Sequence, residues 1–487
     1  MMNKRNILTI ALMAIAVIAF SFTLSSYNIR QSKLTAEISP SSRDTARQMK
    51  TKKEKFLRQL MNDNYDELWA KVDSIDRLGQ PKSALEIVDK IYDKATKEKN
   101  ATQTVKALIY QNRYNAILEE DGLVKAINRM SLQVDNAEFP VKPLLQSMLA
   151  EAYTSYFQNQ SRVLGRKYRN RSETVNFDKT DIQTWSEADF VRKAIELYEL
   201  SIERDEELQK IDLKDFKELI TNYDADGRAY RNTMYELLAH RALAYFSNER
   251  TYLTKPAYQF YVDKSEYFTR AGIFTDLQIT SKDTASLKLK TLHLYQDLLN
   301  FHINDTDKSA LIDADLKRLD FIYNNYNGAD KDNLYEAALV NMEKRYLNNP
   351  LSSEVSYKLA KLHLKKGGNY DRRKGDEHKW ELKSAYTIAS EAIKRHPNSL
   401  GATQCETILN VLNQKELNLT FEQVNIPNKP ILGVINYKNI DHAYGKVVKV
   451  THDEMRELNQ KSQKEWFEII NSKPTVQAFY MKLKGSD

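Results

Sequence analysis

Two pieces of sequence decide how this chain folds: VSYKLAKLHLKK (355–366) and, after a polar gap, WELKSAYTIASEAIKRHP (380–397). In the second piece Ala385, Ala389 and Ala392 are spaced by four and three residues, which places three small side chains on one face of a helix. Pro397 then ends that helix, because proline cannot donate the next backbone hydrogen bond. The pattern predicts a helical hairpin, 355–366 against 380–395, with four side chains of the first helix turned inward: Tyr357, Leu359, Ala360 and Leu362.

The same intervals occur earlier in the chain, at Ala338, Met342, Arg345 and Pro350. Such spacings are typical of the tetratricopeptide (TPR) unit, whose period is about 34 residues. The two copies lie forty-seven residues apart, so that period is restored only if 367–379 is a loop insertion. An ordinary helical hairpin outside any repeat family stays the alternative.

The composition favours amphipathic helices. The 487 residues are too many for one core and predict two or three domains, while 13 glycines, 10 prolines and 29% charged residues suit helices with solvated outer faces. The formal net charge of +7 is small for this length, and no basic run is interleaved with aromatic residues, so a nucleic-acid partner is not expected. The 28 tyrosines are interpreted as core residues, with a carbohydrate-stacking surface as the alternative.

The N-terminus has the layout of an export signal. Lys4 and Arg5 precede an apolar run over 7–24, and polar residues follow from Ser25. We predict that residues 1–26 form a cleaved signal peptide or, because about 18 apolar residues can cross a bilayer, an uncleaved anchor. Residues 27–51 then form a linker. No cysteine follows the apolar run, which excludes lipoprotein processing. The protein is expected in the periplasm or cell envelope, touching the membrane only through 7–24 if that segment is retained.

Residues 52–415 carry a helical period throughout. Gly79 and Pro81 mark a tight turn, since glycine ends one helix and proline suits the first turn of the next. Trp185, Ser186 and Phe190 predict a capped and stapled helix start. The expected fold is mainly α: an α-solenoid of TPR-like hairpins, each covering the apolar face of its neighbour. Helices are predicted over 54–78, 84–95, 105–118, 144–157, 190–208, 234–246, 287–301, 311–326 and 334–347.

A basic cluster lies in the polar segment 162–184, which is predicted to be a loop. Its members are Arg166, Lys167, Arg169 and Arg171. Such a cluster is compatible with an acidic partner, but the favoured interpretation is a solvated loop that binds nothing.

The period changes from 3.6 to two near residue 416. Alternating stretches predict strands over 417–421, 431–437, 444–450 and 476–482, with a short helix over 452–459. So few strands do not close a sandwich and leave a long unpaired edge. We predict that 416–487 is a small, incomplete β-sandwich-like domain and that the chain is the front end of a longer protein.

No combination of residues points to catalysis. None of the eight histidines pairs across one helical turn with a glutamate between, and no glycine-rich phosphate loop precedes a helix. Asp376, Glu377 and His378 are adjacent loop residues, which makes a poor metal site. The single Cys405 lies in a helical stretch and is expected to be buried and inert. We predict no catalytic, cofactor-binding or metal-binding residue and no enzyme activity.

Several phrases give the chain a family resemblance: the segment from Leu68 to Tyr92 with its Gly79-x-Pro81 turn, and later NKP (428–430) and INYKN (435–439). With an export signal, a helical region and a β-region in that order, the chain resembles the N-terminal part of the large exported bacterial alpha-2-macroglobulin-like proteins. The resemblance implies a helical leader followed by the first of several macroglobulin-like β-sandwich domains, within a protein that traps or inhibits proteases.

This sequence differs from that family in the elements with which the family captures proteases. It holds no Cys-Gly-Glu-Gln thioester, since Cys405 is followed by Glu406 and Thr407, and the bait region is missing. The resemblance therefore implies no site residue here and no protease trapping by this polypeptide alone.

Three functions follow from these patterns. The first is an exported, non-enzymatic helical-repeat scaffold that binds protein partners in the groove of its solenoid, as the leader of an alpha-2-macroglobulin-like endopeptidase inhibitor. The second is a TPR-based extracytoplasmic binder of glycans or other ligands that uses exposed tyrosines. The third is a hydrolase with a dispersed active site.

Overall fold

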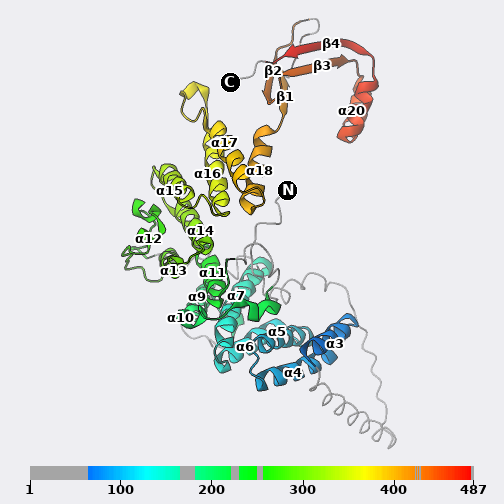
Figure 1. The fold of residues 1–487 in the computed structure, drawn as a ribbon. Helices are drawn as coiled ribbons and strands as arrows, with labels where there is room; N and C mark the ends of the chain where they lie inside the picture. The colour runs from blue at the N-terminus through cyan, green and yellow to red at the C-terminus, as the bar shows by residue number, and fades with distance from the viewer. Residues whose placement is uncertain are drawn as a thin grey trace, which may run out of the picture. The chain divides into compact units, whose positions relative to one another are not determined.

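Figure 1 shows the helices and strands of the computed structural model, which describes residues 64–164, 181–220, 230–248, 256–422 and 429–483, together with Val424 and Ile426. The chain divides after Ala338 into two units, 1–338 and 339–487. The predicted signal segment 1–26 and linker 27–51 lie outside the described residues, as does the start of the predicted helix 54–78.

The described part of the first unit consists of helices and short 3-10 turns and contains no strand. The helices predicted there by periodicity are present where the structure describes them, with two larger differences: the predicted helix 190–208 is divided into two helices, and the predicted helix 144–157 extends over 141–164. The other described ends differ by a few residues. The α-helices are α3 (Tyr65–Arg77), α4 (Pro81–Lys97), α5 (Ala101–Leu118), α6 (Gly122–Asn136), α7 (Val141–Leu164), α9 (Glu187–Ile202), α10 (Asp205–Leu208), α11 (Met234–Phe246), α12 (Ala271–Phe274), α13 (Leu287–His302) and α14 (Ser309–Asn325); the 3-10 turns are η2 (Ile182–Thr184), η3 (Leu213–Leu219) and η5 (Ser265–Phe268).

Two predicted helix boundaries are confirmed with their physical causes. Gly79 has a φ of +68°, a left-handed conformation that ends α3 without a steric penalty, and Pro81 occupies the first turn of α4. At the start of α9, Ser186 and Asp189 form a reciprocal capping box, and the Trp185 and Phe190 rings lie 5.1 Å apart as the predicted staple.

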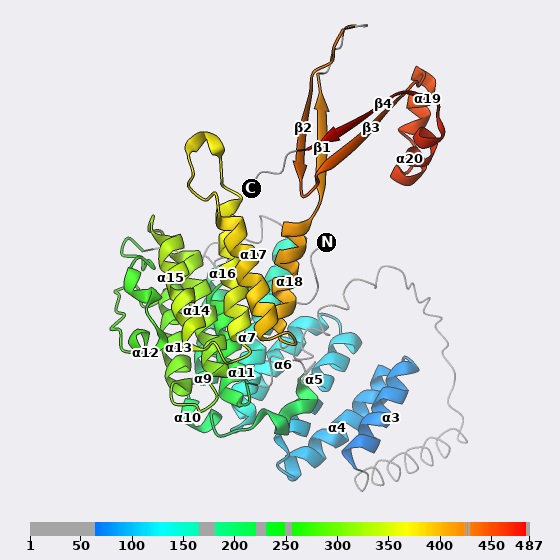
Figure 2. The same cartoon turned by 45° about the horizontal axis from the view of Figure 1, so that its top comes forward.

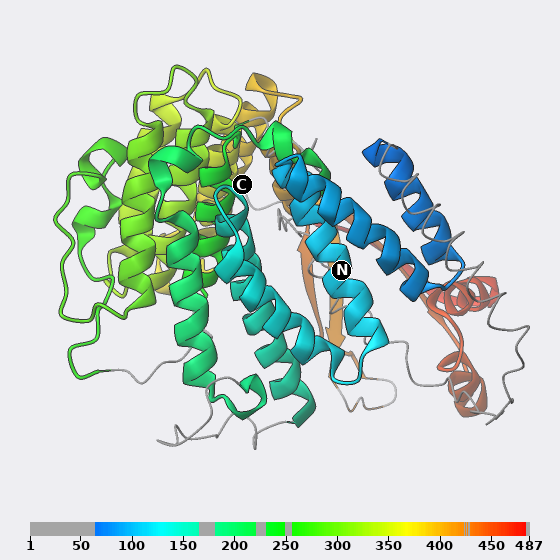
Figure 3. The ribbon, with the colours of Figure 1, turned by 90° about the horizontal axis from the view of Figure 1, so that it is seen from below.

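Helices of the first unit pack mainly on their neighbours in sequence. In the order α3, α4, α5, α6, α7, α9, α11, α13 and α14, each helix contacts the next one. Figure 3 shows α3, α4 and α5 (blue to cyan) side by side. Helix α6 was not among the predicted helices, although Ala126, Ile127, Met130 and Val134 are buried at helical spacing. Consecutive packing is what hairpin repeats require, since each exposes an apolar face for the next.

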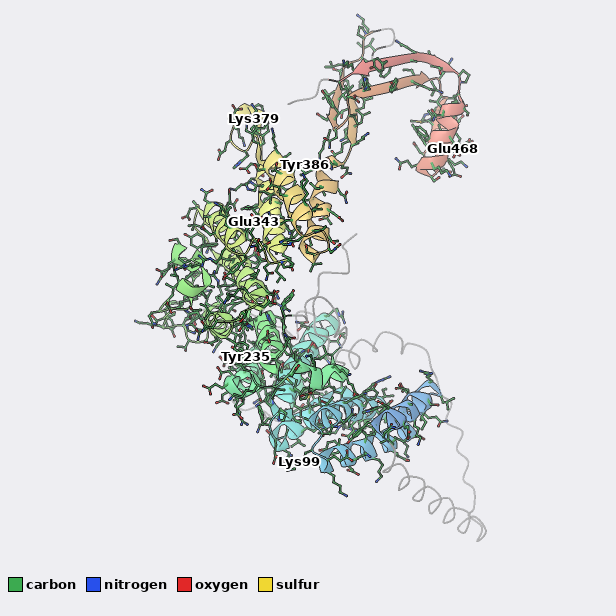
Figure 4. All side chains as sticks on the ribbon, in the orientation of Figure 1. Lys99, Tyr235, Glu343, Lys379, Tyr386 and Glu468 are labelled. Atoms are coloured by element: carbon green, nitrogen blue, oxygen red, sulfur yellow. The ribbon has the colours of Figure 1, made fainter. Side chains whose placement is uncertain are left out.

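The second unit begins within α15 (Lys331–Arg345) and continues with α16 (Ser352–Gly367), α17 (Glu381–Arg395) and α18 (Leu400–Asn413), which lie side by side in Figure 2. The predicted hairpin is confirmed: Ala385, Ala389 and Ala392 are fully buried against Ala360. The connection between α16 and α17 is the predicted loop, with a 3-10 turn η6 (Arg372–Lys374) and Lys379 near its end (Figure 4).

The earlier copy of the alanine spacing is realised only in part. Met342 is buried, but Ala338 is half-buried and Arg345 is exposed. Arg345 is at the last turn of α15, where a cation interacts favourably with the helix dipole and gains nothing from burial. The fully buried position in this helix is Leu339, next to the predicted Ala338.

Two β-hairpins follow the helices. Strand β1 (Glu416–Phe421) pairs antiparallel with β2 (Gly433–Lys438), and β3 (His442–Val448) pairs antiparallel with β4 (Thr475–Lys482). The four predicted strands and the helix α19 (His452–Leu458) are present, and α20 (Gln463–Ser472) was not predicted. Among the described residues the strands form two separate two-stranded sheets, so a β-sandwich is not formed by this part of the chain.

Both hairpins place a phenylalanine across from a glycine. Phe421 faces Gly433 and Phe479 faces Gly445. A Cβ on Gly433 would lie 2.8 Å from the Phe421 ring, and one on Gly445 would lie 1.9 Å from the Phe479 ring. Each ring therefore lies over the missing side chain of its partner, a pairing that pins the register of the two strands.

Candidate functional site

The residues that the sequence singled out for chemistry do not converge. Cys405 is fully buried in the core of α16, α17 and α18, and burial raises the pKa of its thiol to about 12. A thiol in that state is not a nucleophile at neutral pH. This outcome agrees with the prediction of an inert structural cysteine.

The loop residues Asp376, Glu377 and His378 are not a metal site in the structure. His378 has a φ of +65°, and its ring lies 3.6 Å from carboxylate oxygens of Glu377 and of Glu381. Glu381 also bonds to His363 of α16, and although burial alone would raise the pKa of Glu381, the hydrogen bond and charge of His363 lower it. No group of three metal-ligating side chains occurs among the described residues. These contacts tie the loop to the two helices.

Several buried charges lie together between the segment before α11, α11 itself and α14. The guanidinium of Arg231 donates to both carboxylate oxygens of Asp313, at 2.6 Å from Nη2 to Oδ1 and 2.9 Å from Nε to Oδ2. Lys317 Nζ adds a third contact at 2.9 Å, and His240 Nε2 lies 3.8 Å from Asp313. Burial alone would raise the pKa of Asp313, but Lys317 and Arg231 outweigh it and hold that pKa far below its usual range.

A second charged group on the same helices is centred on His302. Its Nε2 lies 3.3 Å from Glu236 and its Nδ1 lies 2.8 Å from Asp305. Burial alone would lower the pKa of His302, but its hydrogen bonds to Glu236 and Asp305 outweigh burial and raise that pKa. His240 has the opposite shift, because burial and then the positive charges of Lys317 and Arg231 lower its pKa well below normal.

These buried charges are arranged as a structural network. Arg231, Asp313, Glu236 and His302 are each less than a tenth exposed. Glu236 is also committed to the capping box of α11, where it accepts from the Thr233 backbone. Paired charges of this kind connect the segment before α11 and α11 itself to α13 and α14.

The raised pKa of His302 predicts a pH dependence of stability. A histidine whose folded pKa lies above its unfolded value stabilises the fold fully below about pH 6.5 and loses that contribution as the pH rises through the folded pKa. We expect His302→Gln to lower the free energy of unfolding by about 1–1.5 kcal/mol at pH 5.5 and by much less at pH 9. Urea unfolding at the two pH values measures this, with the exposed His452→Gln as the matched control.

An equal cost of His302→Gln at both pH values would contradict this account. The groups that face His302 are Glu236 and His240 of α11 and Asp305 after α13. His240 is present in the original chain and in the His302→Gln variant. Its own contribution to the pH dependence of stability therefore cancels to first order when the two are compared.

An amphipathic hairpin surface is uncovered in the second unit. The register places Leu417, Leu419 and Phe421 on one face of β1–β2, together with Ile435 and Tyr437, while Asn418, Thr420, Val434 and Asn436 lie on the other. Leu417, Leu419 and Phe421 are each about half exposed, at 48%, 47% and 52%. We call Leu417, Leu419, Phe421 and Ile435 the β1–β2 apolar face.

The β3–β4 hairpin carries an exposed aromatic group. Tyr444 and Tyr480 are cross-strand partners whose rings lie 5.1 Å apart, and the His442 ring is stacked 5.5 Å from Tyr480. Tyr444 is 79% exposed and Tyr480 is 53% exposed. Flat, exposed aromatic rings of this kind suit stacking against a planar or apolar ligand face.

About half of the tyrosines that the structure describes in the helical region are core residues, 11 of 21, so the prediction is confirmed for these. Several are amphipathic in the expected way: Tyr323 donates to Asp332 and stacks on Tyr335 at 4.2 Å. The buried tyrosines among the described residues are Tyr110, Tyr114, Tyr153, Tyr156, Tyr198, Tyr235, Tyr245, Tyr267, Tyr295, Tyr326 and Tyr335.

The structure does not test two of the predicted surface features. The basic cluster Arg166, Lys167, Arg169 and Arg171 falls outside the described residues, as does the apolar segment 7–24. Every helix within the described ranges is too short or too polar to cross a bilayer.

Comparison with known proteins gives this chain no relative. It matches no protein-family model, no curated protein and no solved structure.

Proposed function

We propose that this chain is an exported, non-enzymatic helical-repeat scaffold, the leader of an alpha-2-macroglobulin-like endopeptidase inhibitor that itself lacks the bait region and the thioester. In this proposal the helical hairpins form a TPR-like solenoid, and the hairpins β1–β2 and β3–β4 belong to a macroglobulin-like domain. The observation that carries the proposal is the uncovered β1–β2 apolar face.

The helical part supports a scaffold because its buried charges between α11, α13 and α14 are paired with one another. Arg231 is bound to Asp313, and His302 bridges Glu236 and Asp305. The thiol of Cys405 is buried among the alanines of α16 and α17. A repeat structure built this way presents surface and shape to a partner, which requires no catalytic group.

The β1–β2 hairpin supports a domain that is completed by further strands. A two-stranded hairpin is marginally stable by itself and needs a covered apolar face. Leu417, Leu419 and Phe421 leave about half of their surface in water, and exposed strand edges are ready templates for further pairing. We propose that additional strands of a macroglobulin-like domain cover this face.

The test is co-expression of the full chain with the polypeptide encoded immediately downstream of its reading frame. We expect the two to co-purify, and Leu419→Lys to weaken that association at least ten-fold, because a charge on the β1–β2 apolar face would be buried by the added strands. The matched control is Asn418→Lys, the neighbouring position on the opposite face, which should leave the association unchanged.

Two outcomes would contradict the proposal: a downstream sequence that encodes no strand-forming polypeptide, or association that Leu419→Lys leaves intact. Because Leu419 is already half exposed, the substitution is expected to change the stability of the chain alone very little. Loss of binding can therefore be separated from loss of folding.

A glycan-binding protein is the second candidate, favoured by the exposed Tyr444–Tyr480 pair. The two functions are distinguished by applying the full chain to a glycan array. Binding that is lost in Tyr444→Ala would favour the second candidate, since strands covering β1–β2 do not require this ring.

A further inference from the structure

A cleft lies between the end of α6, the start of α7 and the end of α9. Its volume is about 350 Å³, within the range of about 300–1,000 Å³ that small-ligand sites occupy. Its lining combines apolar side chains with charged groups. The apolar lining comprises Val134, Phe139, Pro143, Leu197 and Leu200.

One buried polar side chain lines this cleft without a partner. Gln146 of α7 is 6% exposed, yet its amide makes no hydrogen bond to another described residue. The amide keeps some contact with solvent and is therefore available to a ligand in the cleft. A ligand that offers both a donor and an acceptor, as a peptide group does, would satisfy it.

Some of the charges around the cleft are already paired. Lys193 binds Glu196 at 2.9 Å. Arg204 binds Glu207 and lies 4.3 Å from the Phe139 ring in a cation–π contact. Three lining charges form no ion pair with any described residue: Lys142, Asp135 and Glu203.

Each of these three charges lies at a helix end that carries a partial charge of the same sign. Lys142 is in the first turn of α7, the positive end of that helix, which has no acidic residue in its first turn. Asp135 is in the last turn of α6 and Glu203 is the C-cap of α9, both negative ends. Each placement is unfavourable in the free protein and is relieved by a ligand of the opposite charge.

We propose that this cleft binds a short zwitterionic peptide that carries an apolar side chain. The peptide carboxylate lies at the start of α7 beside Lys142, and its ammonium group lies between Asp135 and Glu203. The peptide bond pairs with the Gln146 amide, and the apolar side chain packs on Val134 and Leu197. This binding site belongs to the first unit and the β1–β2 apolar face to the second, and the site does not depend on the proposed scaffold function.

Calorimetric titration of the full chain with the dipeptide leucyl-leucine tests the proposal. We expect saturable binding that both N-acetylation and C-amidation of the dipeptide weaken, because each removes one of its charges. Gln146→Leu and Lys142→Met are each expected to weaken binding at least ten-fold. The matched control is Gln158→Leu, an exposed glutamine farther along α7, which should bind within two-fold of the unmodified chain.

Several results would overturn the proposal. They are no binding of leucyl-leucine at several millimolar, equal binding of the acetylated dipeptide, or affinity that both Gln146→Leu and Lys142→Met leave unchanged. Lys142 is partly exposed, so its variant keeps the test valid if Gln146→Leu fails to fold. Circular dichroism of each variant checks the fold independently of binding.

Discussion

Replacing Arg318 with methionine is expected to destabilise the packing around α14 by about 3–5 kcal/mol. Arg318 is fully buried, and its guanidinium serves three acceptors: Nε donates to Asp315 at 2.7 Å, Nη2 donates to the Thr269 carbonyl at 2.8 Å, and Nη1 donates to the Tyr267 carbonyl. Methionine fills similar space but satisfies none of these groups. The segment that includes η5 would lose the side chain that anchors it to α14.

Hydrogen–deuterium exchange of α13, α14 and the segment 265–274 measures this effect, together with urea unfolding. The matched control is Arg270→Met, since Arg270 belongs to the same segment but is exposed and forms no ion pair with a described residue. We expect the control to change stability by less than about 0.5 kcal/mol. If hydrogen–deuterium exchange is equal in the two variants, the three contacts of Arg318 contribute little to the stability of the packing around α14.

Local signals in the sequence predicted the helices well. The turn at Gly79 and Pro81 and the cap at Ser186 depend on single residues whose backbone preferences act locally, and both are confirmed. Among the described residues three helices were missed, the short α12 and two helices for which signals were present. The apolar spacing from Ala126 to Val134 marks α6, and Ser462 with Glu465 forms a capping box at the start of α20.

Other features had no signal in the sequence because they join distant residues. Arg231 and Asp313 are 82 positions apart, and nothing in either neighbourhood indicates that they pair. The cleft combines Gln146 of α7 with Leu197 of α9, and each position reads as an ordinary helical residue. At Ala338 and Arg345 the sequence pattern predicted burial that the structure does not show. Matching intervals alone do not make a position buried, and the charged side chain of Arg345 stays in water.

The hairpins show why strand periodicity predicts elements better than it predicts a domain. Alternation identified all four strands, since it reports which face of each strand is apolar. It does not report which strands pair, and the observed pairs β1–β2 and β3–β4 form separate sheets. Leu419 and Phe421 lie on the predicted apolar face and are half exposed, so the strand pattern does not tell which segment packs on that face.

Gly401→Ala tests the packing of α18 on α16, where helix propensity and packing predict opposite signs. Gly401 is the second residue of α18, where the advantage of alanine over glycine is at most the value of about 1 kcal/mol found in a helix interior. A Cβ on Gly401 would lie only 2.2 Å from the Ser353 carbonyl carbon and 2.3 Å from the Glu354 nitrogen, both backbone atoms of α16. Because backbone cannot move aside as a flexible side chain does, we expect packing to win and α18 to be destabilised by about 2–3 kcal/mol.

The single Cys405 provides the measurement, since it lies on α18 and is fully buried. Its thiol reacts with a thiol reagent only when α18 opens, so a loss of about 2–3 kcal/mol raises the labelling rate by about 30- to 150-fold. Gly368→Ala is the matched control, because its Cβ would meet the nearest backbone oxygens at 3.4 and 3.6 Å, which is ordinary contact. We expect Gly368→Ala to label no faster than about twice the original rate. If Gly401→Ala labels as slowly as this control, the close approach of α18 to α16 does not limit the stability of the three-helix core.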